Sequence, residues 1–289
     1  MFKVLTLNNI AVEGLRRLPR ERYEVASEIA HPDAILLRSH NMHDMDIPDT
    51  VAAVGRAGAG TNNIPCDMLA HCGVPVFNAP GANANAVKEL MIAGMLLGAR
   101  NLCDARDYVK TLKGTGDELK KAVESGKKQF VGFELPGKTL GVIGLGAIGV
   151  EVANAALDLG MKVVGFDPAI TVRNAWQLSS GVEQEETLDE LFQRADFVTC
   201  HVPLIDATRK RVNADRIALM NVDAVLINFA RGGIVDDAAA LAALDSGKLH
   251  AYVTDFPTPE LIAHPKVIAL PHLGASTGEA ESNCAIMVA

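Results

Sequence analysis

Two residues near the carboxyl end of the chain, Glu260 and His272, are of the types that move protons in an active site. A histidine held by a carboxylate can gain or lose a proton near neutral pH. Of the eight histidines, only His272 follows an expected strand in the sheet crevice and precedes a helix cap, Ser276-Thr277. The pattern predicts an acid–base pair able to take the hydroxyl proton when a secondary alcohol is oxidised.

A second group of residues is Gly144-Leu145-Gly146-Ala147-Ile148-Gly149, a G-x-G-x-x-G run between an expected strand and an expected helix. There, glycines permit a tight turn and the close approach of a pyrophosphate, which the positive end of the helix attracts. Asp167 follows the next strand about 20 residues on, where an acid binds the adenosine ribose and repels a 2′-phosphate. The run predicts NAD rather than NADP; the alternative is a glycine-rich turn without a ligand.

Polar residues also follow three later strands, at the sheet edge where ligands of doubly wound sheets bind. These segments are Cys200-His201-Val202-Pro203, Asn228-Phe229-Ala230-Arg231-Gly232 and Thr254-Asp255-Phe256. We expect Arg231 to point into the crevice beside the nicotinamide; the alternative is a surface salt bridge.

Short apolar strands alternate with helical segments along most of the chain, which is typical of parallel sheets covered by helices. The expected strands of the larger series are Thr139–Ile143, Lys162–Phe166, Phe197–Val202, Ala224–Asn228, His250–Asp255 and Val267–Leu270, with helices that include Val150–Leu159 and Ala238–Leu244. A smaller series precedes it, with strands at Lys3–Leu7, Ala34–Arg38, Val51–Arg56 and Pro75–Phe77 and helices at Val12–Leu18 and around Cys66–His71. A long apolar helix over Ala86–Leu112 is expected to join the two series.

Composition narrows the class of protein. The chain has 289 residues and a formal net charge of −8, which argues against a nucleic-acid partner. Five irregularly spaced cysteines indicate reduced thiols, and no apolar run reaches the ~20 residues of a membrane span. His40 and His43 lack nearby ligands, so no metal site is expected. We expect a cytoplasmic protein with neither a membrane nor a nucleic-acid partner.

Several motifs in the same order resemble the D-2-hydroxyacid dehydrogenase family from about Ala34 onward. Besides the glycine run they are Leu37-Arg38-Ser39, Gly55-Arg56-Ala57-Gly58-Ala59-Gly60-Thr61-Asn62-Asn63-Ile64, Asn78-Ala79-Pro80-Gly81-Ala82-Asn83, Asn228-Phe229-Ala230-Arg231-Gly232-Gly233, Asp255-Phe256-Pro257-Thr258-Pro259-Glu260 and Pro271-His272-Leu273-Gly274-Ala275-Ser276-Thr277. The resemblance implies an α/β protein with a doubly wound parallel-sheet (Rossmann) NAD-binding domain, residues 89–273. It also implies a smaller flavodoxin-like substrate-binding domain, residues 1–88 and 274–289.

The resemblance also implies a role for each matching residue. His272 is similar to the general acid/base, Glu260 to the carboxylate that keeps it protonatable, and Arg231 to the clamp on the substrate carboxylate. The implied cofactor contacts are Gly144, Gly146, Ala147, Ile148, Gly149, Asp167, His201, Val202, Pro203, Thr208, Ala230, Asp255 and Gly274. The implied substrate contacts are Arg38, Ser39, Arg56, Gly58 and Asn83, of which the two arginines could bind a phosphate or be ordinary solvated charges.

The activity that the resemblance implies is NAD-dependent oxidation of 3-phospho-D-glycerate to 3-phosphohydroxypyruvate, the first step of serine biosynthesis. Alternatives are a glycerate or hydroxypyruvate reductase, a D-lactate dehydrogenase, or an NAD-sensing protein that resembles corepressors of this fold. The apolar helix and the resemblance favour a homodimer or a higher homo-oligomer. The sequence departs from the family's pattern at Thr61-Asn62-Asn63 and at Lys88, and it ends where we expect a helix that would return to the substrate domain. The substrate domain is therefore expected to be truncated at its carboxyl end.

Overall fold

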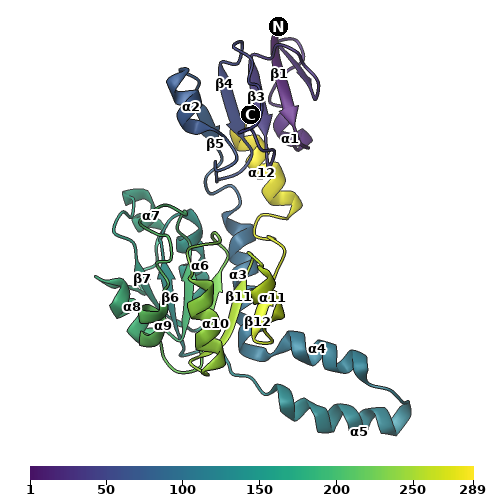
Figure 1. Ribbon diagram of the computed structural model, residues 1–289, viewed down its shortest axis with the longest axis vertical. Helices are drawn as coiled ribbons and strands as arrows, with labels where there is room; N and C mark the ends of the chain where they lie inside the picture. Colours follow the sequence, from purple (N-terminus) through teal and green to yellow (C-terminus); the bar gives the residue numbers. More distant parts are fainter. The chain divides into compact units, whose positions relative to one another are not determined.

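A computed structural model describes residues 1–289, which divide into two compact units. Unit 1 comprises residues 1–86 and 275–289, and unit 2 comprises residues 87–274. The expected boundaries lay after residues 88 and 273. Each unit is built on one parallel sheet with helices packed against it (Figure 1).

Unit 1 holds a five-stranded parallel sheet in the order β2-β1-β3-β4-β5. Its strands are β1 (Phe2–Leu7), β2 (Tyr23–Ala26), β3 (Ala34–Leu37), β4 (Ala53–Arg56) and β5 (Val76–Asn78). Its helices are α1 (Val12–Leu15), α2 (Cys66–His71) and α12 (Gly278–Val288). The sequence patterns placed four of these strands within two residues and missed β2, whose residues alternate without a buried face.

The strands of unit 1 bury residues on both faces of the sheet, as a parallel sheet requires. On β3, Ile35 and Leu37 contact one apolar cluster and Leu36 contacts the other. Helix α12 adds Cys284 and Ala285 to the second cluster. Helix α12 therefore packs on the same core as the strands of residues 1–86.

Unit 2 holds a seven-stranded parallel sheet in the order β12-β11-β10-β9-β6-β7-β8. Its strands are β6 (Thr139–Ile143), β7 (Lys162–Phe166), β8 (Val182–Gln184), β9 (Phe197–Cys200), β10 (Ala224–Asn228), β11 (Leu249–Thr254) and β12 (Val267–Ala269). The helices that follow strands are α6 (Ala147–Asp158), α7 (Val172–Gln177), α8 (Leu188–Arg194), α9 (Ala214–Leu219), α10 (Asp237–Asp245) and α11 (Pro259–Ala263). The order reverses between β6 and β9, which is where ligands of doubly wound sheets bind.

Two apolar layers cover the sheet of unit 2. One contains residues of α8, α9 and α10, such as Leu191, Ile217 and Leu244. The other contains Met91 and Met95 of α3 (Ala84–Arg100) together with residues of α6. The predicted doubly wound α/β class is confirmed by this arrangement.

The prediction of a single helix over Ala86–Leu112 is wrong. Helix α3 ends at Arg100, and α4 (Leu102–Thr111) begins beyond Asn101, whose φ of 49° is left-handed. Asparagine tolerates that conformation better than most residues. The side-chain Nδ2 of Asn101 also donates to the Val131 carbonyl oxygen at 3.2 Å. The polar stretch that follows forms α5 (Gly116–Gly126) and a short 3-10 helix, η1 (Lys127–Phe130).

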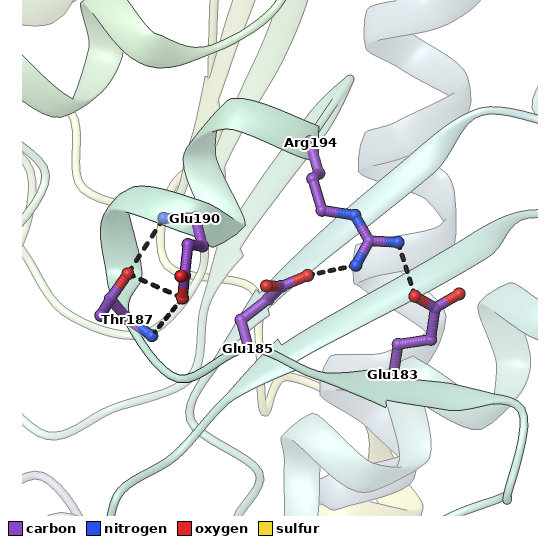
Figure 2. Close-up of polar contacts among 5 residues, drawn as sticks. All are labelled: Glu183, Glu185, Thr187, Glu190 and Arg194. Carbon is purple, nitrogen blue, oxygen red and sulfur yellow. Dashed lines mark hydrogen bonds and ion pairs between the residues drawn. The ribbon is translucent and has the colours of Figure 1, made fainter.

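The outer strand β8 is fixed to α8 by charge pairs (Figure 2). Arg194 pairs with Glu185 and, at 2.6 Å, with Glu183, while Thr187 and Glu190 form a capping box at the start of α8. The ion pairs hold α8 beside the edge of the sheet, and charged side chains on an edge strand also disfavour its pairing with another chain. No helix of the chain has the length and apolar character needed to cross a bilayer.

Candidate functional site: a dinucleotide loop and two sets of charged residues

The glycine run of unit 2 forms the turn from β6 into α6. Gly144 has a φ of 92°, and a Cβ there would lie 2.8 Å from the His201 carbonyl oxygen. A Cβ on Gly149 would collide with the Gly144 carbonyl oxygen, whereas a Cβ on Gly146 would meet nothing within 4 Å. Gly146 is the N-cap of α6 and offers no capping side chain, so an anion can reach the first amides of the helix. The loop thus fits the pyrophosphate of a dinucleotide.

Asp167 follows β7 and lies against this loop. Its Oδ2 accepts a hydrogen bond from the Leu145 amide at 2.8 Å, and its Oδ1 accepts one from the Ala169 amide at 2.9 Å. Each carboxylate oxygen can accept a second bond, which leaves capacity for ribose hydroxyls. The negative charge beside the loop disfavours a 2′-phosphate.

The segment after β9 borders the same loop. The His201 amide donates to the Ile143 carbonyl oxygen at 2.8 Å, and its Nε2 lies 3.1 Å from the Thr199 hydroxyl. Desolvation lowers the pKa of His201 to about 4, so its ring is neutral at pH 7. The Thr208 hydroxyl accepts from the Ile205 amide at 2.9 Å and thereby closes the turn that follows Val202 and Pro203.

Arg231 follows β10 and is half-buried. Burial lowers the pKa of its guanidinium, which donates to the Ala230 carbonyl oxygen at 2.7 Å. The Asn228 side chain binds the backbone of this loop twice. Its Nδ2 donates to the Arg231 carbonyl oxygen at 2.9 Å, and its Oδ1 accepts from the Ala230 amide at 3.1 Å. The sequence patterns did not assign Asn228 to the site, since a buried asparagine at a strand end can also be purely structural.

His272 occupies a turn that Asp255 holds. It has a left-handed φ of 56°, and its ring centroid lies 5.1 Å from that of Phe256. Asp255, only 1% exposed, accepts from the Leu273 and Gly274 amides, each at 2.8 Å. The carboxylate expected to contact the cofactor therefore uses both oxygens to fix the backbone directly after His272.

Glu260 and His272 are not linked by a hydrogen bond or an ion pair. Its side chain is exposed near the start of α11, where hydrogen bonds from its own amide and from the Thr258 hydroxyl lower the pKa of its carboxyl. No ion pair joins Glu260 to His272, although each belongs to unit 2. The acid–base pair stays a prediction.

The residues expected to bind the substrate lie at strand ends of unit 1. Arg38, after β3, forms an ion pair with Glu281 of α12 and donates to the Ala275 carbonyl oxygen at 3.4 Å. The Ser39 amide beside it donates to Asn8 Oδ1 at 3.0 Å. Neither Glu281 nor Asn8 was assigned by the sequence patterns.

Arg56 and Asn83 complete this group. The Arg56 guanidinium lies over Gly58, where any Cβ would collide with it, so the glycine makes room for the arginine. Asn83 Oδ1 is buried without a hydrogen-bond partner, which leaves an acceptor available to a ligand. No cluster of three or more His, Cys, Asp or Glu side chains is placed to hold a metal ion.

The chain belongs to the D-isomer specific 2-hydroxyacid dehydrogenase family. Residues 92–274 match that family's NAD-binding domain, so unit 2 is an NAD-binding domain. Among curated relatives, D-3-phosphoglycerate dehydrogenase of Methanocaldococcus jannaschii is 38% identical over 92% of this chain and 50% of its own length. The Bacillus subtilis protein of the same name is 36% identical over 100% of this chain and 56% of its own length. The chain thus spans about half the length of the curated relatives it matches.

Solved structures agree with this family. The holo form of Rhodotorula graminis D-mandelate dehydrogenase has a TM-score of 0.82 and 26% identity, covering 98% of this chain and 90% of its own. The NAD+-bound 3-phosphoglycerate dehydrogenase of Entamoeba histolytica has a TM-score of 0.74 and 24% identity, covering 99% of this chain and 92% of its own. At that identity the second likeness shows the fold.

Proposed function

We propose that this chain oxidises 3-phospho-D-glycerate to 3-phosphohydroxypyruvate with NAD, as the first step of serine biosynthesis in the cytoplasm. The observation that carries the proposal is the match of nearly the whole chain to relatives named D-3-phosphoglycerate dehydrogenase. The NAD-binding unit contributes the residue types that this oxidation needs, Arg231, Glu260 and His272.

Arg231 binds the substrate carboxylate, because a guanidinium can donate two parallel hydrogen bonds to it. Burial lowers the pKa of Arg231 but leaves the group charged at neutral pH. His272 takes the hydroxyl proton, and Glu260 keeps the ring protonatable as that proton is transferred. When bound, NAD would supply the acceptor for the hydride that leaves C2 of the substrate.

Gly144, Gly146, Ala147, Ile148, Gly149, Asp167, His201, Val202, Pro203, Thr208, Ala230, Asp255 and Gly274 are the residues we assign to NAD. In unit 1, Arg38 and Arg56 bind the substrate phosphate, with Ser39 and Gly58 beside them. Asn83 accepts a hydrogen bond from the substrate, since its buried oxygen lacks a donor in the protein.

The test is NADH formation with 3-phospho-D-glycerate, D-glycerate and D-lactate, using this chain and its His272→Ala variant. We expect turnover with the phosphorylated acid and at least a hundredfold loss in the variant, which should retain its NAD affinity. Turnover with an unphosphorylated acid alone would refute the substrate. NAD binding without turnover of any acid would instead favour an NAD-sensing protein.

One observation favours a second substrate. Glu281 already neutralises part of the charge that Arg38 would offer to a phosphate. An unphosphorylated acid such as D-glycerate or D-lactate needs fewer cations, so an activity confined to such acids is the second candidate.

We also propose a homodimer. Helices α4 and α5 extend away from the sheet of unit 2 (Figure 1), and α4 buries no residue of its own. Leu102, Val109 and Val123 are exposed on this pair of helices, which suits contact with a second copy. Sedimentation of the Val109→Asp variant as a monomer, beside a dimeric wild type, is the expected result; a monomeric wild type would refute the proposal.

A further inference from the structure

Leu145, the second residue of the glycine run, has both of its backbone polar groups bound by side chains outside the loop. Its amide donates to Asp167 Oδ2 at 2.8 Å, and its carbonyl oxygen accepts from Asn174 Nδ2 at 3.2 Å. Its side chain, buried in the second apolar layer of unit 2, packs over Gly165 of β7. One residue of the loop is therefore held at three points.

Asn174 lies in α7, a short helix that is itself fixed at both ends. The Thr171 hydroxyl caps the helix by accepting from the Asn174 amide at 3.2 Å. Beyond the other end, Asn154 of α6 donates to the Gln177 carbonyl oxygen and accepts from the Ser179 amide, each at 2.9 Å. Because α7 is anchored to α6, the Asn174 side chain is a fixed support for the loop rather than a surface group that meets it by chance.

We propose that Asn174 is a positioning residue for NAD: its side chain holds the glycine loop in the conformation that receives the pyrophosphate. The proposal rests on the NAD-binding domain of unit 2 and does not depend on which acid is the substrate. Asn174 is not proposed to touch the nicotinamide or the substrate. It acts through its hydrogen bond to the Leu145 carbonyl oxygen. The loop is bound on one side by Asp167 and on the other by Asn174, and loss of either support enlarges the set of loop conformations.

The affinity for NAD depends on the fraction of molecules whose glycine loop has the binding conformation. A ligand that binds one conformation of a loop binds more weakly in proportion to the fraction of molecules that adopt it. A single hydrogen bond of this kind contributes about 0.5–1.5 kcal/mol, which corresponds to a roughly two- to tenfold change in affinity. Removing the Asn174 donor should therefore weaken NAD binding by about that factor.

The decisive variant is Asn174→Asp, which keeps the size and shape of the side chain but replaces the donor with an oxygen. An acid is favourable in the first turn of a helix, so α7 should form normally. Asn174→Ala removes the side chain altogether. Gln177→Ala is the matched control, because Gln177 lies in the same helix with an exposed side chain and contributes only its carbonyl oxygen.

Two measurements test the proposal. Calorimetric titration with NAD should show weaker binding by Asn174→Ala, and weaker still by Asn174→Asp, whose carboxylate faces an oxygen and adds charge near the pyrophosphate. Hydrogen exchange without NAD should be faster at the amides of Leu145 and Gly146 in both variants. Gln177→Ala should match wild type in each measurement, and the thermal midpoints of all three variants should stay close to that of wild type.

The proposal is overturned if Asn174→Asp binds NAD within twofold of wild type. It is also overturned if exchange rises throughout unit 2 rather than in the loop, because Asn174 would then stabilise the fold in general. Neither result depends on dehydrogenase activity. A failure of the substrate proposal, with loss of turnover but normal NAD binding, is thus distinguishable from a failure of this one.

Discussion

The two units hold the residues that we propose to bind ligands in different ways. In unit 2, Asp167, Asn228 and Asp255 each use both side-chain polar groups on nearby backbone atoms. In unit 1, Arg38 pairs with another side chain, Glu281, and Asn83 Oδ1 is buried without a partner. Side chains fix nearby backbone in both units, as Asn8 does at the Ser39 amide, but the residues that we assign to the substrate in unit 1 include polar groups whose partners can come from a ligand.

The difference indicates a division of labour in binding. A cofactor of constant shape is best met by a rigid, preorganised loop, since little freedom is then lost on binding. A side chain such as Arg38 can leave its ion pair for different acids at small cost, because an exposed ion pair adds little free energy of stabilisation. Substitutions of the residues that fix the loops of unit 2 should therefore have large effects on turnover or NAD affinity, and substitutions at Arg38 or Glu281 of unit 1 should have small, ligand-dependent ones.

Outside the proposed acid–base residues, the largest effect should come from Asp255→Ala. It leaves the amides of Leu273 and Gly274 without acceptors and releases the turn of His272, so we expect roughly a hundredfold loss of turnover. Initial rates of NADH formation measure it. Asp245→Ala removes an exposed carboxylate of the same unit and should be neutral. Full activity of Asp255→Ala would show that the turn is fixed by other contacts.

The free energy of unfolding should depend on pH because of His201. Its folded pKa of about 4 lies below its unfolded value of about 6.5, so the unfolded chain is protonated first as pH falls. The stability present above pH 6.5 is then lost toward pH 4, by up to roughly 3 kcal/mol. Denaturant unfolding followed by far-UV circular dichroism at a series of pH values measures this loss, because Trp176, the only tryptophan, is already 86% exposed in the folded chain. His201→Gln should remove this part of the pH dependence; an unchanged profile would exclude His201 as its source.

Gly146→Ala should separate folding from binding. The fold has room for a Cβ at this position, and its φ of −72° suits alanine. A methyl group in front of the first amides of α6 should nevertheless weaken NAD binding about tenfold. Calorimetry measures the affinity, and Gly278→Ala, also in open space, is the control. Equal NAD affinity of the two variants would place the pyrophosphate elsewhere.

The smallest effect should come from Glu281→Gln. It frees Arg38 from an exposed ion pair, so the KM for a phosphorylated acid should fall about two- to fivefold. The KM for D-lactate and the affinity for NAD should stay unchanged. A rise in the KM for the phosphorylated acid would mean that Glu281 orients Arg38 rather than competes for it.

The sequence was most informative where one short segment contains the whole signal. The glycine run, its strand and its helix are contiguous, and β6 has the predicted bounds, Thr139–Ile143. Thr277 caps α12 as its place before the helix suggests. Local patterns of turn, strand and helix require no knowledge of distant residues.

The sequence was least informative where the partner lies far along the chain or the residue type is ambiguous. Glu281 meets Arg38 across 243 positions, a pairing that no local pattern specifies. Asn174 looks like any polar residue of a surface helix until its contact with Leu145 is seen. The break at Asn101 has no glycine or proline to mark it, because Arg100 before it and Leu102 after it both suit a helix.

Unit 1 is built from two separate segments of the chain, which affects how the protein folds during its synthesis. Residues 1–86 leave the ribosome before unit 2, but α12, which covers one face of their sheet, emerges only after the whole of unit 2. At typical rates of synthesis that delay is on the order of 10–40 s. During that time the apolar residues that α12 later covers, among them Leu36, lack their partner helix, and exposed apolar surface of this kind favours aggregation. Unit 2 can finish folding first, so the nascent chain acquires its NAD-binding part before residues 1–86 gain the helix that packs on them.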